Sequence, residues 1–251
     1  MTKRAATRGL PDVARRREFS RRLRRWFARN ARDLPWRRTR DPYAVLVSEL
    51  MLQQTQVSRV VTRYGEFLEQ FPTLHDVARA RPARVMEAWE GLGYYARARN
   101  LHRLARQVTD HGRMADATLP ADAAELRELP GIGAYTAGAV SSFAYERRSA
   151  LVDTNVARVI KRAFAPTVDT KSTRGQRRVW AIADCLLPRT GRATWVHNQA
   201  LMELGALVCT ARVARCGQCP VRPLCASAKP SDMSPRTARV TRLIRTTEAI
   251  T

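Results

Sequence analysis

Four of the five cysteines gather near the end of the sequence, at Cys209, Cys216, Cys219 and Cys225, with the spacing Cys-x6-Cys-x2-Cys-x5-Cys. Thiols this close together are typical of metal ligands rather than of core residues. By number alone they suit either one tetrahedral zinc ion or a four-iron four-sulfur cluster. Four thiolates leave no open coordination position, so we expect this centre to shape the fold and not to perform catalysis.

A second candidate site lies within residues 129–155. Pro130 disfavours a helical backbone in the residue before it, and Gly131 and Gly133 can adopt positive φ, so the sequence predicts a tight turn between two helices. The first amides of the second helix would then suit an anion such as a DNA phosphate, although a plain helix break fits the same residues. Asp153 follows this helix, either as an N-cap or as a reactive carboxylate.

The charge of the chain limits the classes of partner. Its 45 Lys and Arg against 22 Asp and Glu give a net charge of +23, which predicts a nucleic-acid partner or, less favoured, an anionic membrane surface. Residues 1–40 hold fifteen of these basic residues and three acidic ones. With no long apolar run and no secretory segment, we expect a cytoplasmic, nucleoid-associated protein without disulfides.

The periodicity of apolar residues predicts an all-α fold, because no strand-type alternation occurs. We expect a flexible basic arm over residues 1–18, then an amphipathic helix from Phe19 to about Arg29. A long helix is predicted over residues 43–64. It would carry Glu49. Because the apolar periodicity is blurred here, the sequence does not show whether the Glu49 side chain faces the solvent or the core.

Five strings of residues together resemble the helix-hairpin-helix (HhH-GPD) DNA glycosylase superfamily, and within it the MutY-type adenine glycosylases. They are Leu-Pro-Trp-Arg at 34–37, Ser-Glu-Leu-Met-Leu-Gln-Gln-Thr at 48–55, Gly-Leu-Gly-Tyr-Tyr-Ala-Arg-Ala-Arg at 91–99, Leu-Pro-Gly-Ile-Gly at 129–133, and the cysteine pattern. The resemblance covers about residues 19–225.

The resemblance implies two domains with the active site in the cleft between them. A six-helix barrel would span residues 43–145 and contain the helix-hairpin-helix at about 122–140. An iron-sulfur cluster domain would combine residues 19–42 with residues 146–225. The tail, residues 226–251, is expected to be flexible.

The roles of individual residues also follow from the resemblance. Glu49 would protonate a flipped base, ionised Asp153 would stabilise the sugar cation, and Asn155 would orient a carboxylate or a water. Tyr135 stands where bifunctional relatives keep a lysine, which implies a monofunctional glycosylase. Trp36 and Arg37 are expected near the base pocket. Neutral hydrogen-bonding, stacking and phosphate-binding residues make up the expected DNA contacts: Gln53, Gln54, Thr55, Tyr94, Tyr95, Arg97, Arg99, Gly131 and Gly133.

The cysteine spacing, followed by Pro220, is similar to the four-iron four-sulfur loop of this branch, so the resemblance implies that cluster, with zinc as the alternative. Arg212, Arg215 and Arg222 lie in the same loop and predict a basic surface facing DNA.

One departure from the resemblance opens a second hypothesis. MutY-type enzymes carry a C-terminal domain that reads 8-oxoguanine, whereas 26 residues follow Cys225 here. From the matching strings of residues we expect a monomeric enzyme that excises adenine opposite guanine or 8-oxoguanine in duplex DNA, and the departure leaves two alternatives. A thymine or uracil glycosylase for T:G or U:G mismatches is the first alternative, and a non-catalytic damage-binding protein is the second.

Overall fold

The computed structural model describes residues 10–110 and 118–228, and within them the fold is all-α, as predicted. Residues 1–9 of the expected arm, residues 229–251 of the expected tail, and residues 111–117 lie outside the described residues. None of the helices in the described part is long and apolar enough to cross a bilayer. The helices are α1 (Val13–Asn30), α2 (Pro42–Leu52), α3 (Val57–Gln70), α4 (Leu74–Arg79), α5 (Pro82–Ala88), α6 (Ala96–Asp110), α7 (Ala123–Arg127), α8 (Ala134–Phe143), α9 (Thr154–Phe164), α10 (Thr173–Leu186) and α11 (Gly191–Leu207), with short 3-10 turns η1 (Pro35–Arg37), η2 (Cys216–Gln218) and η3 (Arg222–Leu224).

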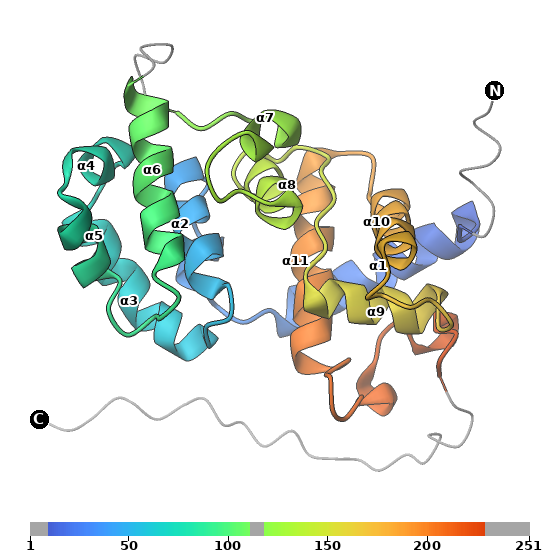
Figure 1. Ribbon diagram of the computed structural model, residues 1–251. Helices are drawn as coiled ribbons and strands as arrows, with labels where there is room; N and C mark the ends of the chain where they lie inside the picture. The colour runs from blue at the N-terminus through green and yellow to red at the C-terminus, as the bar shows by residue number, and fades with distance from the viewer. Residues whose placement is uncertain (1–9, 111–117, 229–251) are drawn as a thin grey trace, which may run out of the picture.

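The helices pack in two groups that lie beside each other (Figure 1). Helices α2 to α8 form one group, in which α2 packs against α3, α6 and α8. The second group joins α1 to α9, α10 and α11, which come from the other end of the chain. Helix α11 also contacts α8 and so bridges the groups.

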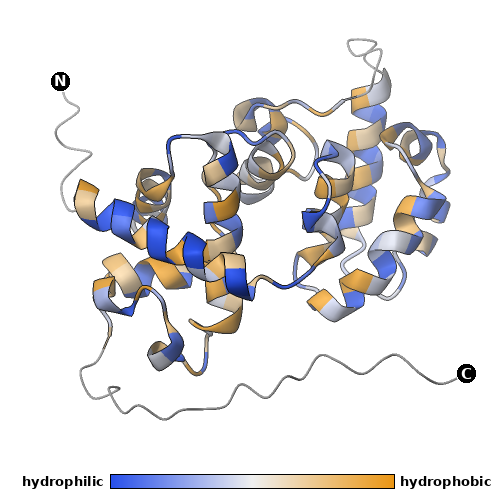
Figure 2. Cartoon of the chain, turned by 180° about the vertical axis from the view of Figure 1, so that it is seen from behind, coloured by the Kyte–Doolittle hydropathy of each residue, from blue (hydrophilic) through white to orange (hydrophobic). Residues whose placement is uncertain are grey.

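The first helix begins six residues earlier than predicted, which corrects the expected end of the flexible arm. Asp12 caps it by accepting a hydrogen bond from the Arg15 amide at 2.9 Å. Glu18 then pairs with Arg21 and Arg22 at 2.6 Å each. The arginines hide the apolar period that normally reveals a helix, and Figure 2 shows their hydrophilic bands along α1.

The predicted long helix over residues 43–64 is wrong: two helices, α2 and α3, replace it. The chain leaves the α-helical conformation at Gln53, and Gln54 has a positive φ of 56°. The carbonyls of Leu50 and Met51 near the end of α2 accept hydrogen bonds from the buried Arg97 guanidinium, at 2.7 and 2.8 Å. A distant side chain therefore supplies the helix end, which no local sequence signal showed.

The predicted hairpin is present as α7, a tight turn and α8, with one correction to the turn. Gly131 has φ +77°, and a Cβ atom there would lie 2.5 Å from the Asn100 side chain, so this position requires glycine. Gly133 instead has φ −87° and is the N-cap of α8. In the described part of the chain, no side chain caps α8, so the amide N–H groups of its first turn receive no capping hydrogen bond.

Candidate active site

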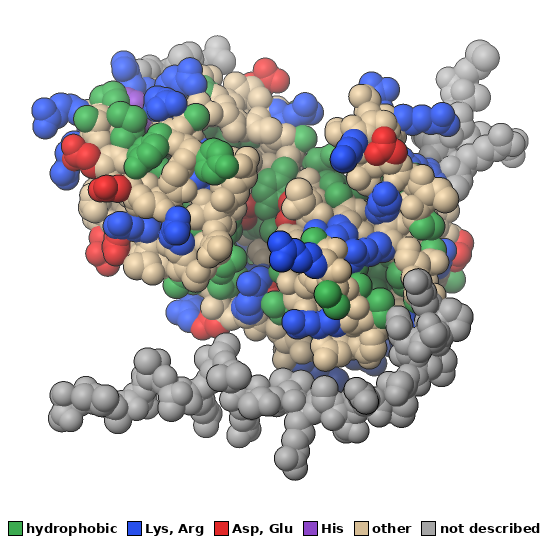
Figure 3. All heavy atoms as spheres, turned by 60° about the horizontal axis from the view of Figure 1, so that its bottom comes forward, with side chains coloured by type: hydrophobic (Ala, Val, Ile, Leu, Met, Phe, Trp, Pro, Cys, Tyr) green, Lys and Arg blue, Asp and Glu red, His purple; other side chains and the backbone are tan. Residues whose placement is uncertain are grey.

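A pocket of about 560 Å³ lies where the two groups of helices meet. Glu49 reaches it from α2, Tyr135 from α8, and Asp153 and Asn155 from the start of α9. Figure 3 shows the molecule hollowed between its two halves, with acidic and hydrophobic side chains visible in the depth of the hollow. Residues predicted from separate motifs thus share one cavity of a size typical for small-ligand sites.

Glu49 is buried, with 3 % of its surface exposed, because α2 is covered on several sides. The Tyr135 hydroxyl donates a hydrogen bond of 2.7 Å to its carboxylate. Burial raises the pKa of Glu49 to about 7, the Tyr135 hydrogen bond opposes that rise, and the negative charge of Asp153 adds to it. Near neutral pH this group can therefore hold a proton and donate it.

Asp153 serves as the N-cap of α9 and also lines the pocket. One carboxylate oxygen accepts from the Val156 amide at 2.6 Å, and the other accepts from the Asn155 side-chain amide at 3.1 Å. Burial raises the pKa of Asp153 overall, and these hydrogen bonds oppose part of that rise. The two N–H donors favour the ionised form, so the carboxylate is held in place to face a positive charge.

Asn155 is fixed in turn by Arg158, one turn later on α9, and by the packing of α9 against α11. Arg158 donates to the Asn155 side-chain oxygen at 2.6 Å and to the carbonyls of Gly205 and Cys209, both at 2.8 Å. Gly205 must be glycine, because a Cβ atom there would lie 2.6 Å from the Cβ atom of Asn155. The site is therefore connected by hydrogen bonds to the start of the cysteine loop, residues 209–225.

Sequence reasoning missed a third carboxylate in this pocket. Glu203 on α11 is fully buried and forms ion pairs with Arg32 and Arg37, each at 2.8 Å. Burial would raise the pKa of Glu203, but the hydrogen bonds from Arg32 and Arg37 outweigh it and lower the pKa to about 2. Gln199, one turn earlier on α11, accepts from Arg37 at 2.9 Å. Gln199 and Glu203 are four residues apart, which places both side chains on one face of α11. This spacing is the sequence pattern that could have indicated a polar site there.

The Leu-Pro-Trp-Arg segment lies at the pocket, as the resemblance implied. Trp36 and Arg37 line it, and Trp36 packs edge-on against Tyr64 with ring centroids 5.6 Å apart. The ion pair with Glu203 fixes the Arg37 guanidinium. The positive charge of Arg37 also lowers the pKa of Glu49.

The Gln-Gln-Thr run lies on the loop between α2 and α3, where all three residues line the pocket. Gln53 donates to the Thr136 hydroxyl at 3.3 Å, and Gln54 is exposed. A strained loop, in place of the expected helix, therefore presents these amides.

The Tyr-Tyr-Ala-Arg-Ala-Arg string divides into exposed and structural residues. Tyr94 and Tyr95 are 60 % and 39 % exposed. Arg97 is instead buried, and its guanidinium donates to seven acceptors, six of them backbone carbonyls, so the expectation that it contacts phosphate is corrected. Arg99 is exposed and lies outside the pocket, beside Pro82.

The four predicted cysteines line one cavity of about 390 Å³ at the end of the second helix group. Burial, together with the negative charge of the other three thiolates, raises the pKa of the Cys219 thiol to about 11. Among the described residues, no three His, Cys, Asp or Glu side chains are placed to hold a single metal ion. Arg212, Arg215 and Arg222 line the same cavity.

Replacing Tyr135 by phenylalanine is expected to shift the pH dependence of the site. The change removes the hydrogen bond that lowers the pKa of Glu49, so that pKa rises above about 7. A proton donor is active only at pH values below its pKa, where it holds its proton. In a plot of single-turnover rate against pH, the fall of the rate on the basic side should therefore move to higher pH. An unchanged limb would show that Glu49 does not govern it.

The helix-hairpin-helix and the carboxylates beside it define the class. The chain belongs to the HhH-GPD superfamily of base excision DNA repair proteins, whose family model matches residues 47–183. Within that class it is similar to adenine DNA glycosylases, with 43 % identity to the human protein over 85 % of this chain and 46 % identity to that of Mycolicibacterium smegmatis over 78 %. It spans 40 % and 65 % of the length of those two relatives.

One solved structure is similar to this chain in both fold and sequence. It is a thermostable thymine-DNA glycosylase, with a TM-score of 0.76 and 29 % identity, covering 86 % of this chain and 97 % of that one.

Proposed function

We propose that this chain is a monofunctional DNA glycosylase that hydrolyses the N-glycosidic bond of adenine mispaired with guanine or 8-oxoguanine. The observation that carries the proposal is that Glu49 and Asp153 share one pocket, in which burial raises the pKa of Glu49 to about 7 and two N–H donors bind the Asp153 carboxylate. The similarity to adenine DNA glycosylases supports adenine as the base.

The reaction requires a proton for the leaving base and an opposite charge for the sugar. Protonated Glu49 donates its proton to a ring nitrogen of the flipped base, and the C–N bond breaks as its electron pair moves to the glycosidic nitrogen of the now neutral base. The Asp153 carboxylate stabilises the resulting oxocarbenium-like sugar until water adds to it. Asn155 holds this carboxylate in place. Trp36 and Arg37 would border the base.

DNA contacts are proposed for Gln53, Gln54 and Thr55, which line the pocket, and for Tyr94, Tyr95 and the hairpin turn, which lie outside it. The exposed tyrosines suit stacking on bases, and the uncapped start of α8 suits a phosphate. The partner would be duplex DNA with a mismatch or lesion, bound by a monomer.

Excision on matched duplexes tests the choice of base. Adenine should be released from A:8-oxoguanine and A:G pairs, as measured by alkali cleavage, with little release from T:G or U:G. A thymine glycosylase is the second candidate, because the thermostable thymine-DNA glycosylase has the same fold. Release of thymine or uracil without adenine would reverse the order.

Tyr135 carries the monofunctional part of the proposal. A buried phenol, whose pKa burial raises well above its usual value, cannot form a Schiff base with the sugar. Borohydride should therefore trap no protein–DNA adduct, while an enzyme with lysine at this position, used as the positive control, gives one. A trapped wild-type adduct would contradict the assignment.

Cys209, Cys216, Cys219 and Cys225 are proposed to hold a four-iron four-sulfur cluster. The cavity gathers four thiols, and four thiolates suit a cubane, in which each thiolate binds a different iron. When bound, the cluster would supply structural cross-linking of the loop.

The purified protein should show broad absorbance near the blue edge of the visible. Cys219→Ser should reduce that absorbance and destabilise the loop, as measured by proteolysis. Cys185→Ser, at the cysteine outside the loop, should change neither. A colourless protein that contains zinc would overturn the choice of metal.

A further inference from the structure

A second groove, of about 850 Å³, lies where the first half of α1 runs beside the end of α10. None of its lining residues lines the catalytic pocket. Asp184 is the one acidic residue among its described lining, against six arginines. We call it the α1–α10 groove; its arginines are Arg16, Arg17, Arg21, Arg24, Arg148 and Arg189.

One face of α1 is built from basic residues. Positions 13, 16, 17, 20, 21 and 24 follow the spacing i, i+3, i+4, i+7, i+8 and i+11, which places them on one side of a helix. Such a stripe is usually apolar and faces the core, but four of its six positions are arginine here. The apolar residues Phe19, Leu23 and Phe27 are buried elsewhere on α1. Helix α1 therefore packs with one side and presents a basic stripe with another.

Internal ion pairs neutralise only part of this charge. Arg21 pairs with Glu18 at 2.6 Å and Arg148 with Asp184 at 3.4 Å. Arg17, Arg24 and Arg189 have no acidic partner among the described residues. Uncompensated like charges on one face repel one another, so binding a polyanion there would lower the free energy.

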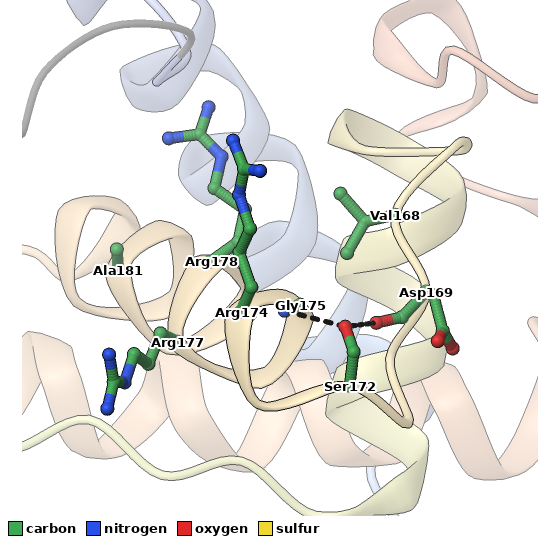
Figure 4. A pocket seen from close by; sticks show the side chains of 8 residues that line it. All are labelled: Val168, Asp169, Ser172, Arg174, Gly175, Arg177, Arg178 and Ala181. Carbon is green, nitrogen blue, oxygen red and sulfur yellow. Dashed lines mark hydrogen bonds between the residues drawn. The ribbon is translucent and has the colours of Figure 1, made fainter.

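A second group of arginines lies near the start of α10. Figure 4 shows Arg174 and Arg178 extending in the same direction from the start of this helix, while Arg177 extends in another. A separate hollow of about 690 Å³ is lined by these three arginines and Asp169.

We propose that the α1–α10 groove binds the phosphodiester backbone of a second nucleic-acid segment while the catalytic pocket engages the first. All six groove cations are arginine, whose planar fork matches phosphate oxygens in pairs. The stripe is also straight and about 16 Å long at 1.5 Å per residue, which suits a polymer with regularly spaced charges. The proposal rests on the proposed function in taking DNA as that polymer, and an acidic protein segment is the competing occupant.

The test counts duplexes bound per protein chain. The full chain is titrated at low ionic strength with a short undamaged duplex, and stoichiometry is measured by sedimentation or native mass spectrometry. Wild type should bind two duplexes, and the triple variant Arg17→Glu/Arg21→Glu/Arg189→Glu should bind one. In a single variant that still binds the second duplex, Arg17→Gln, the slope of log affinity against log salt for that duplex should become shallower by about 0.9 for each phosphate contact removed.

The matched control reverses three exposed arginines in the other group of helices: Arg79→Glu/Arg81→Glu/Arg84→Glu. It changes the net charge equally and should keep the second duplex. A milder Arg17→Gln/Arg21→Gln/Arg189→Gln variant covers the case in which charge reversal disturbs folding, and should weaken the same step. Base excision on a short duplex should be unchanged in all three variants.

Three results would overturn the proposal: a single duplex on wild type, equal loss in the control variant, or stronger competition for the second site by polyglutamate than by single-stranded DNA of equal charge. The last result assigns the groove to an acidic protein segment. Failure of the proposed function would appear separately, as binding of two duplexes without release of any base.

Discussion

Glu49→Gln should lower single-turnover excision of adenine by about 10²- to 10⁴-fold, the range for loss of a positioned general acid. Glutamine has the same shape and can still accept the Tyr135 hydrogen bond, but it has no proton to donate to the base. Because Glu49 has a pKa of about 7, the wild-type site is partly neutral at physiological pH, and binding of mismatched duplex should change little.

The matched control is Glu87→Gln, which removes the same charge from an exposed residue of α5 and should leave excision unchanged. Single-turnover rates and duplex affinity by fluorescence anisotropy separate chemistry from binding. If Glu49→Gln keeps the wild-type rate, the proton comes from elsewhere.

Asp153→Asn should lower excision by about 10²- to 10³-fold, the range for losing one electrostatic contact to a charged transition state. Asparagine caps helices as well as aspartate does, so the hydrogen bond to the Val156 amide can persist and the fold should keep its stability. The variant therefore removes charge while retaining structure.

Asp153→Ala separates the two roles of this residue. It loses both the charge and the cap, so its stability should fall by about 1 kcal/mol as well. Thermal unfolding and single-turnover rates are measured for both variants. Wild-type turnover in Asp153→Asn would leave Asp153 with the capping role alone.

The sequence predicted features that depend on neighbouring residues. The turn at Gly131, the capping of α9 by Asp153 and the grouping of four cysteines follow from local backbone preferences and spacing. The all-α class follows likewise from periodicity. Where a helix lacked an apolar period, as in the arginine-rich start of α1, the same reasoning placed its beginning too late.

The burial and pairing of side chains appeared only in the folded chain. Glu49 and Tyr135 are 86 residues apart in sequence, yet they share a hydrogen bond. Arg97 looks like a phosphate ligand in sequence but closes the end of α2, while Glu203 looks like a surface residue but forms a buried ion pair. Local rules cannot predict these outcomes, because the number of acceptors around a guanidinium depends on which helices pack there.

The residue types that the proposed reaction needs can therefore be predicted from the sequence. The turns of the chain that present these residues can be predicted as well. Packing of the two helix groups excludes water from Glu49 and raises its pKa to about 7, whereas hydrogen bonds from the start of α9 hold the Asp153 carboxylate. Desolvation is a property of the assembled fold, so only the tertiary structure could give two carboxyl groups different roles.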